Sequence, residues 1–204
     1  MTGFIGLGIM GKPMAKNLLK AGKQLMVFDL NKAAVDEVVS CGAKAASLKE
    51  IGESCDVIFT SLPNGKIVQD VLFGENGVAS AIKPGTIVCD TSSTTPGEAR
   101  FSHDKLEKLG VSFVDCPVSG GEPGAVNGTL AFMAGGEQEA FDKLAPYFEI
   151  MGSSALLIGA SGSGCVDCSG RRWHARSDRR PLGHQAQQQE GGRVRLDGWS
   201  DDGP

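Results

Sequence analysis

Short apolar runs alternate with longer amphipathic segments along residues 2–158. The apolar runs are too short for helices and are bounded by Gly, Asp, Asn or Pro, which is typical of buried strands. The segments between them repeat apolar residues every three to four positions, which predicts amphipathic helices. Strands are expected at 3–6, 25–29, 57–61, 86–90, 112–115, 130–134 and 155–158, and helices at 10–21, 32–40, 48–53, 66–72, 96–109 and 138–151.

The regular alternation of these elements indicates the fold class. Strand–helix–strand units joined by right-handed crossovers build a largely parallel sheet with helices on both faces. Gly22, Gly42 and Gly110 follow predicted helices, where a residue with positive φ ends the last turn. Turns are expected at 74–77 and 127–128. The pattern therefore predicts an α/β domain with a doubly wound, Rossmann-type sheet.

The composition changes abruptly after Gly164. Every lysine lies at or before Lys143, whereas seven of the eight arginines and both tryptophans lie at or after Arg171. Beyond this point a few apolar residues are scattered among arginine pairs, glutamines and glycines, so the segment buries too little surface to offset its chain entropy. We therefore predict an ordered domain over residues 1–164 and an irregular or disordered tail over residues 165–204.

Charge and hydropathy argue against several classes of partner. The net charge of −4 gives no support for nucleic acid as a partner. No run approaches the roughly 18 to 20 apolar residues that span a bilayer. The chain enters its first strand without a basic, cleavable leader, which predicts a cytoplasmic protein. The six cysteines lie mostly singly within apolar segments, as reduced and buried thiols do.

A glycine-rich motif follows the first predicted strand. Gly6-Leu7-Gly8-Ile9-Met10-Gly11 has the pattern G-x-G-x-x-G between a strand and a helix, the context in which it binds a dinucleotide. The first glycine permits a sharp turn, the second lets the backbone approach a pyrophosphate, and the third allows close packing of helix and strand. The helix N-terminus offers free amides to the phosphates. The alternative is an ordinary glycine-rich turn.

The second predicted strand ends at Asp29, about 20 residues beyond the motif, where a carboxylate can bind both hydroxyls of the adenosine ribose. The same carboxylate repels a 2′-phosphate. Leu30 and Asn31 supply no guanidinium, and Lys32 is the one nearby cation. NAD is therefore favoured as the cofactor, with NADP as the alternative.

Two further loops are expected to face the cofactor, because ligands of open parallel sheets lie beyond the carboxyl ends of the strands. They are Leu62-Pro63-Asn64 and residues 90–96, and a third loop follows at residues 115–123. In the last loop a hydroxyl and two glycines could hold a small carboxylate. The alternatives are helix capping by Ser92 or Ser93 and a tight strand-to-helix turn at 119–121.

Residues 4–18 resemble, almost throughout, the N-terminal signature of the β-hydroxyacid dehydrogenase family, which is related to 3-hydroxyisobutyrate dehydrogenase. Pro117-Val118-Ser119-Gly120-Gly121 resembles the substrate-binding segment of that family, and the resemblance covers residues 2–164. Within the family, residues 120–123 and 127–130 resemble the branch that reduces tartronate semialdehyde.

The resemblance implies reversible hydride transfer between a nicotinamide and the alcohol carbon of a small 3-hydroxy acid, or of its semialdehyde. It further implies that Leu62 and Pro63 line the nicotinamide side of the site, that Ser93 approaches the nicotinamide ribose, and that Ser119, Gly120 and Gly121 bind the substrate carboxylate and hydroxyl.

The family's general acid/base is a lysine that follows a glycine pair, and here the resemblance stops. Gly162-Ser163-Gly164 matches the glycine pair, but Cys168 stands at the place of the lysine and Arg171 at that of a family asparagine. Arginine cannot take over, because its guanidinium does not deprotonate. We therefore expect no catalytic residue in this chain.

The family's helical second domain, which carries much of its dimer contact, also has no counterpart. We expect a truncated and impaired oxidoreductase that has lost its homo-oligomer contacts. The alternative is a non-catalytic dinucleotide-binding module. The tail itself is interpreted as an out-of-frame end, with a divergent natural tail as the alternative.

The cysteine pair, the arginine pairs and His103 each have an interpretation of their own. Cys165 and Cys168 form a lone C-x-x-C, for which chance spacing is favoured over a zinc or redox site. The arginine pairs would suit an interaction tail, but acidic residues are interspersed and no nucleic-acid-binding fold accompanies them. His103 is expected on the solvated face of its helix.

Overall fold

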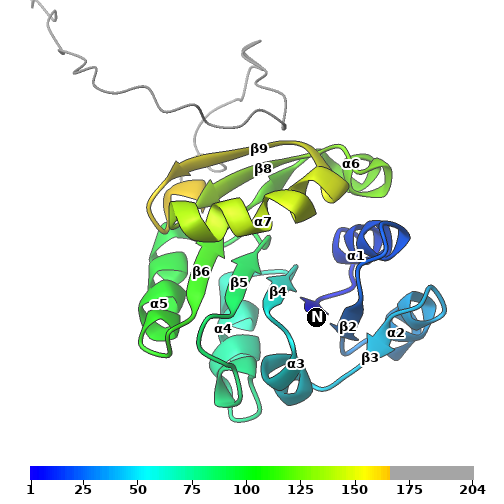
Figure 1. The fold of residues 1–204 in the computed structure, drawn as a ribbon, viewed down its shortest axis with the longest axis horizontal. Helices are drawn as coiled ribbons and strands as arrows, with labels where there is room; N and C mark the ends of the chain where they lie inside the picture. The colour runs from blue at the N-terminus through cyan, green and yellow to red at the C-terminus, as the bar shows by residue number, and fades with distance from the viewer. Residues whose placement is uncertain (166–204) are drawn as a thin grey trace, which may run out of the picture.

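A nine-stranded sheet runs through the computed structural model, which describes residues 1–165 (Figure 1). The strand order is β3-β2-β1-β4-β5-β6-β8-β7, and β9 pairs with β8. The strands are β1 (Thr2–Ile5), β2 (Leu25–Phe28), β3 (Lys44–Ala45), β4 (Val57–Thr60), β5 (Ile87–Asp90), β6 (Ser112–Asp115), β7 (Val118–Ser119), β8 (Leu130–Gly135) and β9 (Gly152–Gly159).

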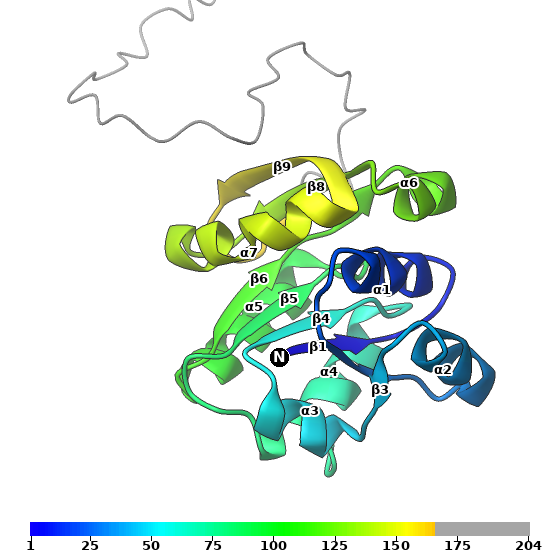
Figure 2. The same ribbon diagram turned by 45° about the vertical axis from the view of Figure 1, so that its right-hand side comes forward.

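Helices cover both faces of this sheet. The first, second and seventh helices pack on one face and the third, fourth and fifth on the other (Figures 1 and 2). They are α1 (Gly11–Lys20), α2 (Lys32–Val39), α3 (Leu48–Ser54), α4 (Gly65–Phe73), α5 (Pro96–Glu107), α6 (Gly121–Asn127) and α7 (Gln138–Met151), with a 3₁₀ turn η1 (Val78–Ser80).

The strand topology confirms the predicted doubly wound fold. Strands β3, β2, β1, β4, β5 and β6 are parallel to their neighbours. Strand β8 then runs antiparallel to β6 and β7 and parallel to β9. The chain moves outward from β1 in one direction to β2 and in the other to β4, so the topological switch point lies between β1 and β4. A ligand site is therefore expected at the carboxyl ends of these two strands.

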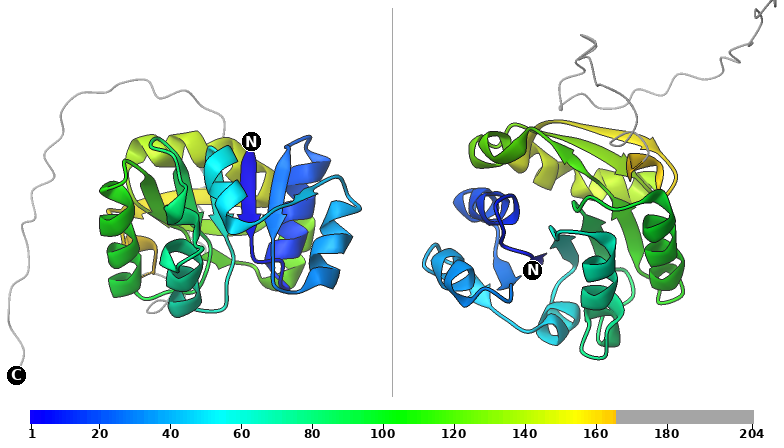
Figure 3. Two further views of the ribbon diagram at one scale, coloured as in Figure 1. Left: turned by 90° about the horizontal axis from the view of Figure 1, so that it is seen from below. Right: turned by 180° about the vertical axis from the view of Figure 1, so that it is seen from behind.

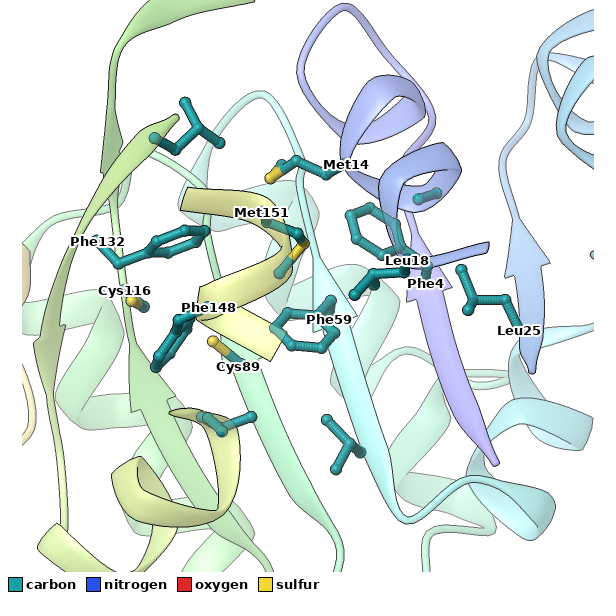
Figure 4. Packing of buried hydrophobic residues seen from close by; sticks show 14 of the residues in the cluster. Phe4, Met14, Leu18, Leu25, Phe59, Cys89, Cys116, Phe132, Phe148 and Met151 are labelled. Atoms are coloured by element: carbon teal, nitrogen blue, oxygen red, sulfur yellow. The ribbon is translucent and has the colours of Figure 1, made fainter. Parts of the chain in front are cut away.

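The largest core cluster lies between the sheet and helices α1 and α7. Phe4 and Phe59 stack with ring centroids 5.9 Å apart, and Phe132 lies 4.7 Å from Phe148. Figure 4 shows Leu18 of α1 beside the first pair. Because both faces of the sheet are covered, its central strands β1, β4 and β5 are buried along their whole length. Each such buried side chain contributes about 1.5–3 kcal/mol.

The predicted elements agree with the structure except where the sequence signal is weak. Most bounds differ by one or two residues, and β9 is longer than predicted because Ser154 also pairs with β8. The two-residue strands β3 and β7 and the helix α6 were not predicted. Strand β3 is exposed and carries no apolar run, while α6 contains Pro123 and glycine. Figure 3 shows that α6, α7, β8 and β9 lie together at one end of the molecule.

The helix ends agree with the predictions at some positions and differ at others. Gly22, Gly42 and Gly110 have positive φ, as predicted. Helix α5 is capped by Thr95 in a capping box with Glu98, so capping by Ser92 or Ser93 was wrong; a cap must lie directly before the first turn.

His103 is half-buried with a buried Nδ1, so its side chain lies only partly on the solvated face expected for it. Cys55, Cys89 and Cys116 are buried as predicted, whereas Cys41 is exposed. Cys165, the first residue of the predicted irregular tail, is also buried, so the ordered part of the chain extends at least one residue further than predicted.

The predictions for the tail beyond residue 165 lie outside the described residues. This applies to its disorder, to Cys168 and Arg171, and to the arginine pairs. Within residues 1–165, no helix has the length and hydrophobicity needed to cross a membrane. The same residues contain no cluster of three or more His, Cys, Asp or Glu side chains suited to a metal ion.

Candidate functional site

A cavity of about 600 Å³ opens at the carboxyl ends of β1, β2, β4 and β5, at the switch point of the sheet. We call it the cleft. It brings together segments that are distant in sequence. Its lining residues are Ile5, Gly6, Gly8, Ile9, Met10, Gly11, Phe28, Asp29, Leu30, Ser61, Leu62, Pro63, Ile67, Val71, Thr91, Ser92, Ser93, Val118 and Gly121.

The glycine-rich loop forms the floor of the cleft. Gly6 has φ +94°, and a Cβ there would collide with the carbonyl oxygen of Ser61. A Cβ at Gly11 would collide with the carbonyl oxygen of Gly6, so α1 can start close to β1 only with glycine at this position. Gly8 differs, because a Cβ there would meet nothing within 4 Å. The first and third glycines are therefore required by the protein's own packing, whereas the space beside Gly8 is open.

Asp29 follows β2 and connects to the glycine loop by hydrogen bonds. Its Oδ2 accepts the backbone N–H of Leu7 at 2.5 Å, and its Oδ1 accepts the backbone N–H of Asn31 at 2.7 Å. A carboxylate has about four lone-pair sites, so these two bonds leave acceptor capacity toward the cleft. The Leu7 side chain is buried, so Leu7 contributes to this region through its backbone N–H. The carboxylate is thus held in one orientation beside the loop.

The opposite wall of the cleft comes from the loops after β4 and β5. The Leu62 N–H donates to Ser92 Oγ at 2.9 Å, which joins the two loops. Leu62 is half-buried and Pro63 is exposed, so an apolar surface faces the cleft. Ser93 is exposed and lines the same cavity. The predicted residues Leu62, Pro63 and Ser93 therefore lie on one wall.

The predicted substrate segment reaches the cleft only in part. Val118 and Gly121 line the cavity, whereas Ser119 and Gly120 are exposed and do not. Gly120 and Gly121 have φ of +131° and +58° and join β7 directly to α6. The expected tight strand-to-helix turn is therefore confirmed.

Two buried carboxyl groups, which begin the loops at 90–96 and 115–123 and were given no role from the sequence, stand close in the chain to residues that line the cleft. Asp90 and Asp115 end the adjacent parallel strands β5 and β6 and are register partners. Asp90 Oδ1 accepts from Thr60 Oγ1 at 2.7 Å and from the Ser92 N–H at 3.1 Å, while its Oδ2 has no hydrogen-bond partner. Burial raises the pKa of both carboxyls above the ordinary range. In the sequence, an aspartate ends each of two consecutive predicted strands, and this pattern could have indicated that the two carboxyl groups lie side by side.

These residues together fit a dinucleotide. Free backbone amides at a loop and helix N-terminus suit phosphates, the space beside Gly8 admits a pyrophosphate, and Asp29 suits ribose hydroxyls. The apolar wall suits a planar ring. The fold and the cleft thus define the class of the protein, a Rossmann-type dinucleotide-binding domain.

The family model described as the NAD binding domain of 6-phosphogluconate dehydrogenase matches residues 1–168. The chain belongs to this family, as an NAD-binding domain of the dehydrogenases related to 3-hydroxyisobutyrate dehydrogenase.

Similar proteins are known in several bacteria. The chain is 45% identical over 164 residues to the NAD-dependent L-serine dehydrogenase of Pseudomonas aeruginosa, covering 80% of this chain and 55% of that protein. It is 44% identical over 163 residues to the 2-hydroxy-3-oxopropionate reductase of Escherichia coli, covering 79% and 56%. The chain thus spans about half the length of the curated relatives it matches.

The fold is also similar to that of a solved structure. The 3-hydroxyisobutyrate dehydrogenase of Mycobacterium tuberculosis, solved with L-serine, superimposes with a TM-score of 0.78 at 34% identity. The match covers 82% of this chain and 57% of that one. The resemblance noted in the sequence is therefore confirmed at the level of the family and the fold.

Proposed function

We propose that the cleft binds NAD and that the chain is the nucleotide-binding part of an oxidoreductase acting on small 3-hydroxy acids and their semialdehydes. The observation that carries the proposal is the cleft itself: the glycine loop, Asp29, and the Leu62–Pro63 wall border one cavity of about 600 Å³. Bound NAD would supply the hydride acceptor, or NADH the donor.

Each segment of the cleft has a separate role in this proposal. In the loop of residues 6–11 the Gly6 and Leu7 N–H groups already donate to Phe28 and Asp29, so the amides of residues 8–11 hold the pyrophosphate, and Asp29 holds the adenosine ribose. Leu62 and Pro63 cover one side of the nicotinamide and exclude water, and Ser93 bonds its ribose. Ser119, Gly120 and Gly121 bind the substrate carboxylate and hydroxyl, which requires the substrate to reach beyond the cavity wall formed by Val118 and Gly121.

NAD is favoured over NADP by the charge at the ribose end. The Asp29 carboxylate is fixed by two backbone amides, so it cannot swing away from a 2′-phosphate without losing both bonds. Lys32, the nearest cation in sequence, does not line the cleft but a second cavity that Asp29 also borders. The name of the Pseudomonas aeruginosa relative states NAD dependence, while a related structure with 27% identity was solved with NADP+.

The proposed reaction resembles that of 2-hydroxy-3-oxopropionate reductase, the tartronate semialdehyde reductase. Turnover by this polypeptide is expected to be impaired, because the chain has no lysine after Lys143 and Cys168 stands where the family has its general acid/base. Loss of such a group lowers rates by about 10²- to 10⁴-fold. We further propose that residues 1–164 form the nucleotide-binding domain and that residues 165–204 do not continue the family pattern.

A non-catalytic dinucleotide-binding module is the second candidate function, supported by the same missing lysine. An assay of NADH oxidation with tartronate semialdehyde separates the two. Turnover that exceeds the background without protein supports the oxidoreductase. Stoichiometric NAD binding without measurable turnover supports the module.

The test of the cleft uses the open space beside Gly8. Gly8→Ala should fold normally, because its Cβ meets no protein atom, yet the methyl group should block the pyrophosphate. The dissociation constant for NAD should rise at least about tenfold, equivalent to about 1.4 kcal/mol. Gly97→Ala is the matched control, since Gly97 also has nothing within 4 Å but does not line the cleft. Equal NAD affinity in both variants would refute the proposal.

A further inference from the structure

The carboxylate of Asp115 holds a turn that lies far away in sequence. Its Oδ1 accepts the backbone N–H of Gly162 at 2.6 Å, and its Oδ2 accepts the backbone N–H of Cys165 at 3.1 Å. Asp115 is 0% exposed, and both bonds are buried. Residues 163–165 are helical, so these amides belong to the start of a helix, where N–H groups have no partner within the helix. Asp115 therefore acts as a remote cap.

Glycines surround this carboxylate and admit nothing larger. A Cβ at Gly135 would lie 2.8 Å from Asp115 Oδ1, and one at Gly164 would lie 2.9 Å from Asp115 Oδ2. A Cβ at Gly164 would also collide with the carbonyl oxygen of Met133. Gly162 has φ +88°, a conformation that favours glycine. The turn is thus pressed onto the ends of β6 and β8 with no room for a side chain between them.

The capped turn adjoins two segments of the cleft. Cys165 Sγ lies 3.2 Å from Thr94 Oγ1, and Thr94 directly follows Ser93 on the cleft wall. Asp115 itself stands three residues before Val118, which lines the cleft on the substrate side. One carboxylate therefore links the end of β6, which leads into the substrate segment, to the turn where the chain leaves the sheet.

We infer that Asp115 is a positioning residue, which fixes the turn at residues 160–165 against the end of β6, next to the Thr94 side of the cleft wall. The inference rests on the proposed function only in naming the cleft as the site that this turn borders. Asp115 does not line the cleft, so cofactor affinity and turn order are separable quantities.

Hydrogen exchange of the full chain, measured by mass spectrometry, tests the inference. In Asp115→Ala, protection of residues 160–165 should fall at least about tenfold, since two bonds to a charged acceptor are lost. Asp115→Asn keeps one acceptor oxygen and should show a smaller loss. The dissociation constant for NAD should change by less than about twofold in both variants, as for independent sites. Unchanged protection in Asp115→Ala, or an equal loss in every segment, would overturn the inference.

A second variant covers the case in which Asp115→Ala does not fold. Gly164→Ala leaves the carboxylate in place but crowds the turn, and it should release the same segment. Thr94→Val is the control, because it removes the contact with the Cys165 thiol and keeps both backbone bonds; protection should persist. Retained protection in Gly164→Ala would overturn the inference. Failure of the wild-type chain to bind NAD would refute the proposed function and leave the exchange result unaffected.

Discussion

The Asp29 carboxylate accepts the backbone N–H of Leu7, one residue into the glycine-rich loop. The residue that would select the ribose therefore also holds the loop that would bind the pyrophosphate. The Asp29 side chain thus connects the part of the cleft that would hold the adenosine ribose with the part that would hold the pyrophosphate.

Asp29→Ala should weaken NAD binding and narrow the preference for NAD over NADP. The variant loses the ribose acceptor and the bond to Leu7, which lowers NAD affinity, but it also removes the charge that repels a 2′-phosphate. Calorimetric titration of both cofactors against wild type and variant measures this change. Tighter binding of NADP than of NAD by the wild type would show that the assignment of NAD is wrong.

Gly11→Ala should destabilise the fold, in contrast to Gly8→Ala. The Cβ at position 11 collides with the Gly6 carbonyl, so backbone must move, at a cost of roughly 1–3 kcal/mol. The free energy of unfolding from urea titrations gives the comparison. Equal stability of the two alanine variants would contradict the packing role of Gly11.

Asp90→Asn should change the pH dependence of stability. Burial raises the pKa of the folded carboxyl, whereas the unfolded carboxyl titrates near about 3.9. The folded chain therefore binds this proton more tightly, and the free energy of unfolding falls as the pH rises from the unfolded pKa through the folded one. Asparagine does not titrate, so the variant should gain stability relative to wild type as the pH rises through that window.

Unfolding curves of wild type and Asp90→Asn at several pH values give this difference directly. Burial also raises the pKa of Asp115, so the stability of both proteins still depends on pH through that residue. The difference in the free energy of unfolding between the two proteins therefore reports on Asp90. A difference that is constant with pH would contradict the prediction.

Among the five cysteines within residues 1–165, Cys41 should react first with an alkylating reagent under native conditions. Cys41 is exposed, whereas burial raises the pKa of Cys55 to about 11 and that of Cys165 to about 12. The thiolate is the reactive form, so the buried thiols are protected by both burial and protonation. Mass spectrometry with fragmentation assigns the labelled sites. Labelling of Cys165 as fast as that of Cys41 would contradict the buried turn.

The sequence by itself determined the α/β class, the order of the long elements and the position of the glycine loop. These features depend on local patterns: apolar runs, helical spacing, and glycines at fixed offsets. The same local patterns place four site residues at or just after strand ends: Asp29, Leu62, Pro63 and Ser93. Because parallel strands bring their carboxyl ends to one edge of the sheet, these residues were expected to lie near one another.

Only the tertiary structure decided what surrounds each of these residues. Strand β7 and helix α6 form because β8 and α1 are there to pack against, and neither has a local apolar signal. The bonds from Gly162 and Cys165 to Asp115 join residues 47 and 50 positions apart, and no periodicity reports such a contact. The contrast between Gly8 and Gly11 likewise depends on which atoms the fold brings within reach of a methyl group. Local patterns specify elements, whereas contacts between distant segments arise only when the chain has closed on itself.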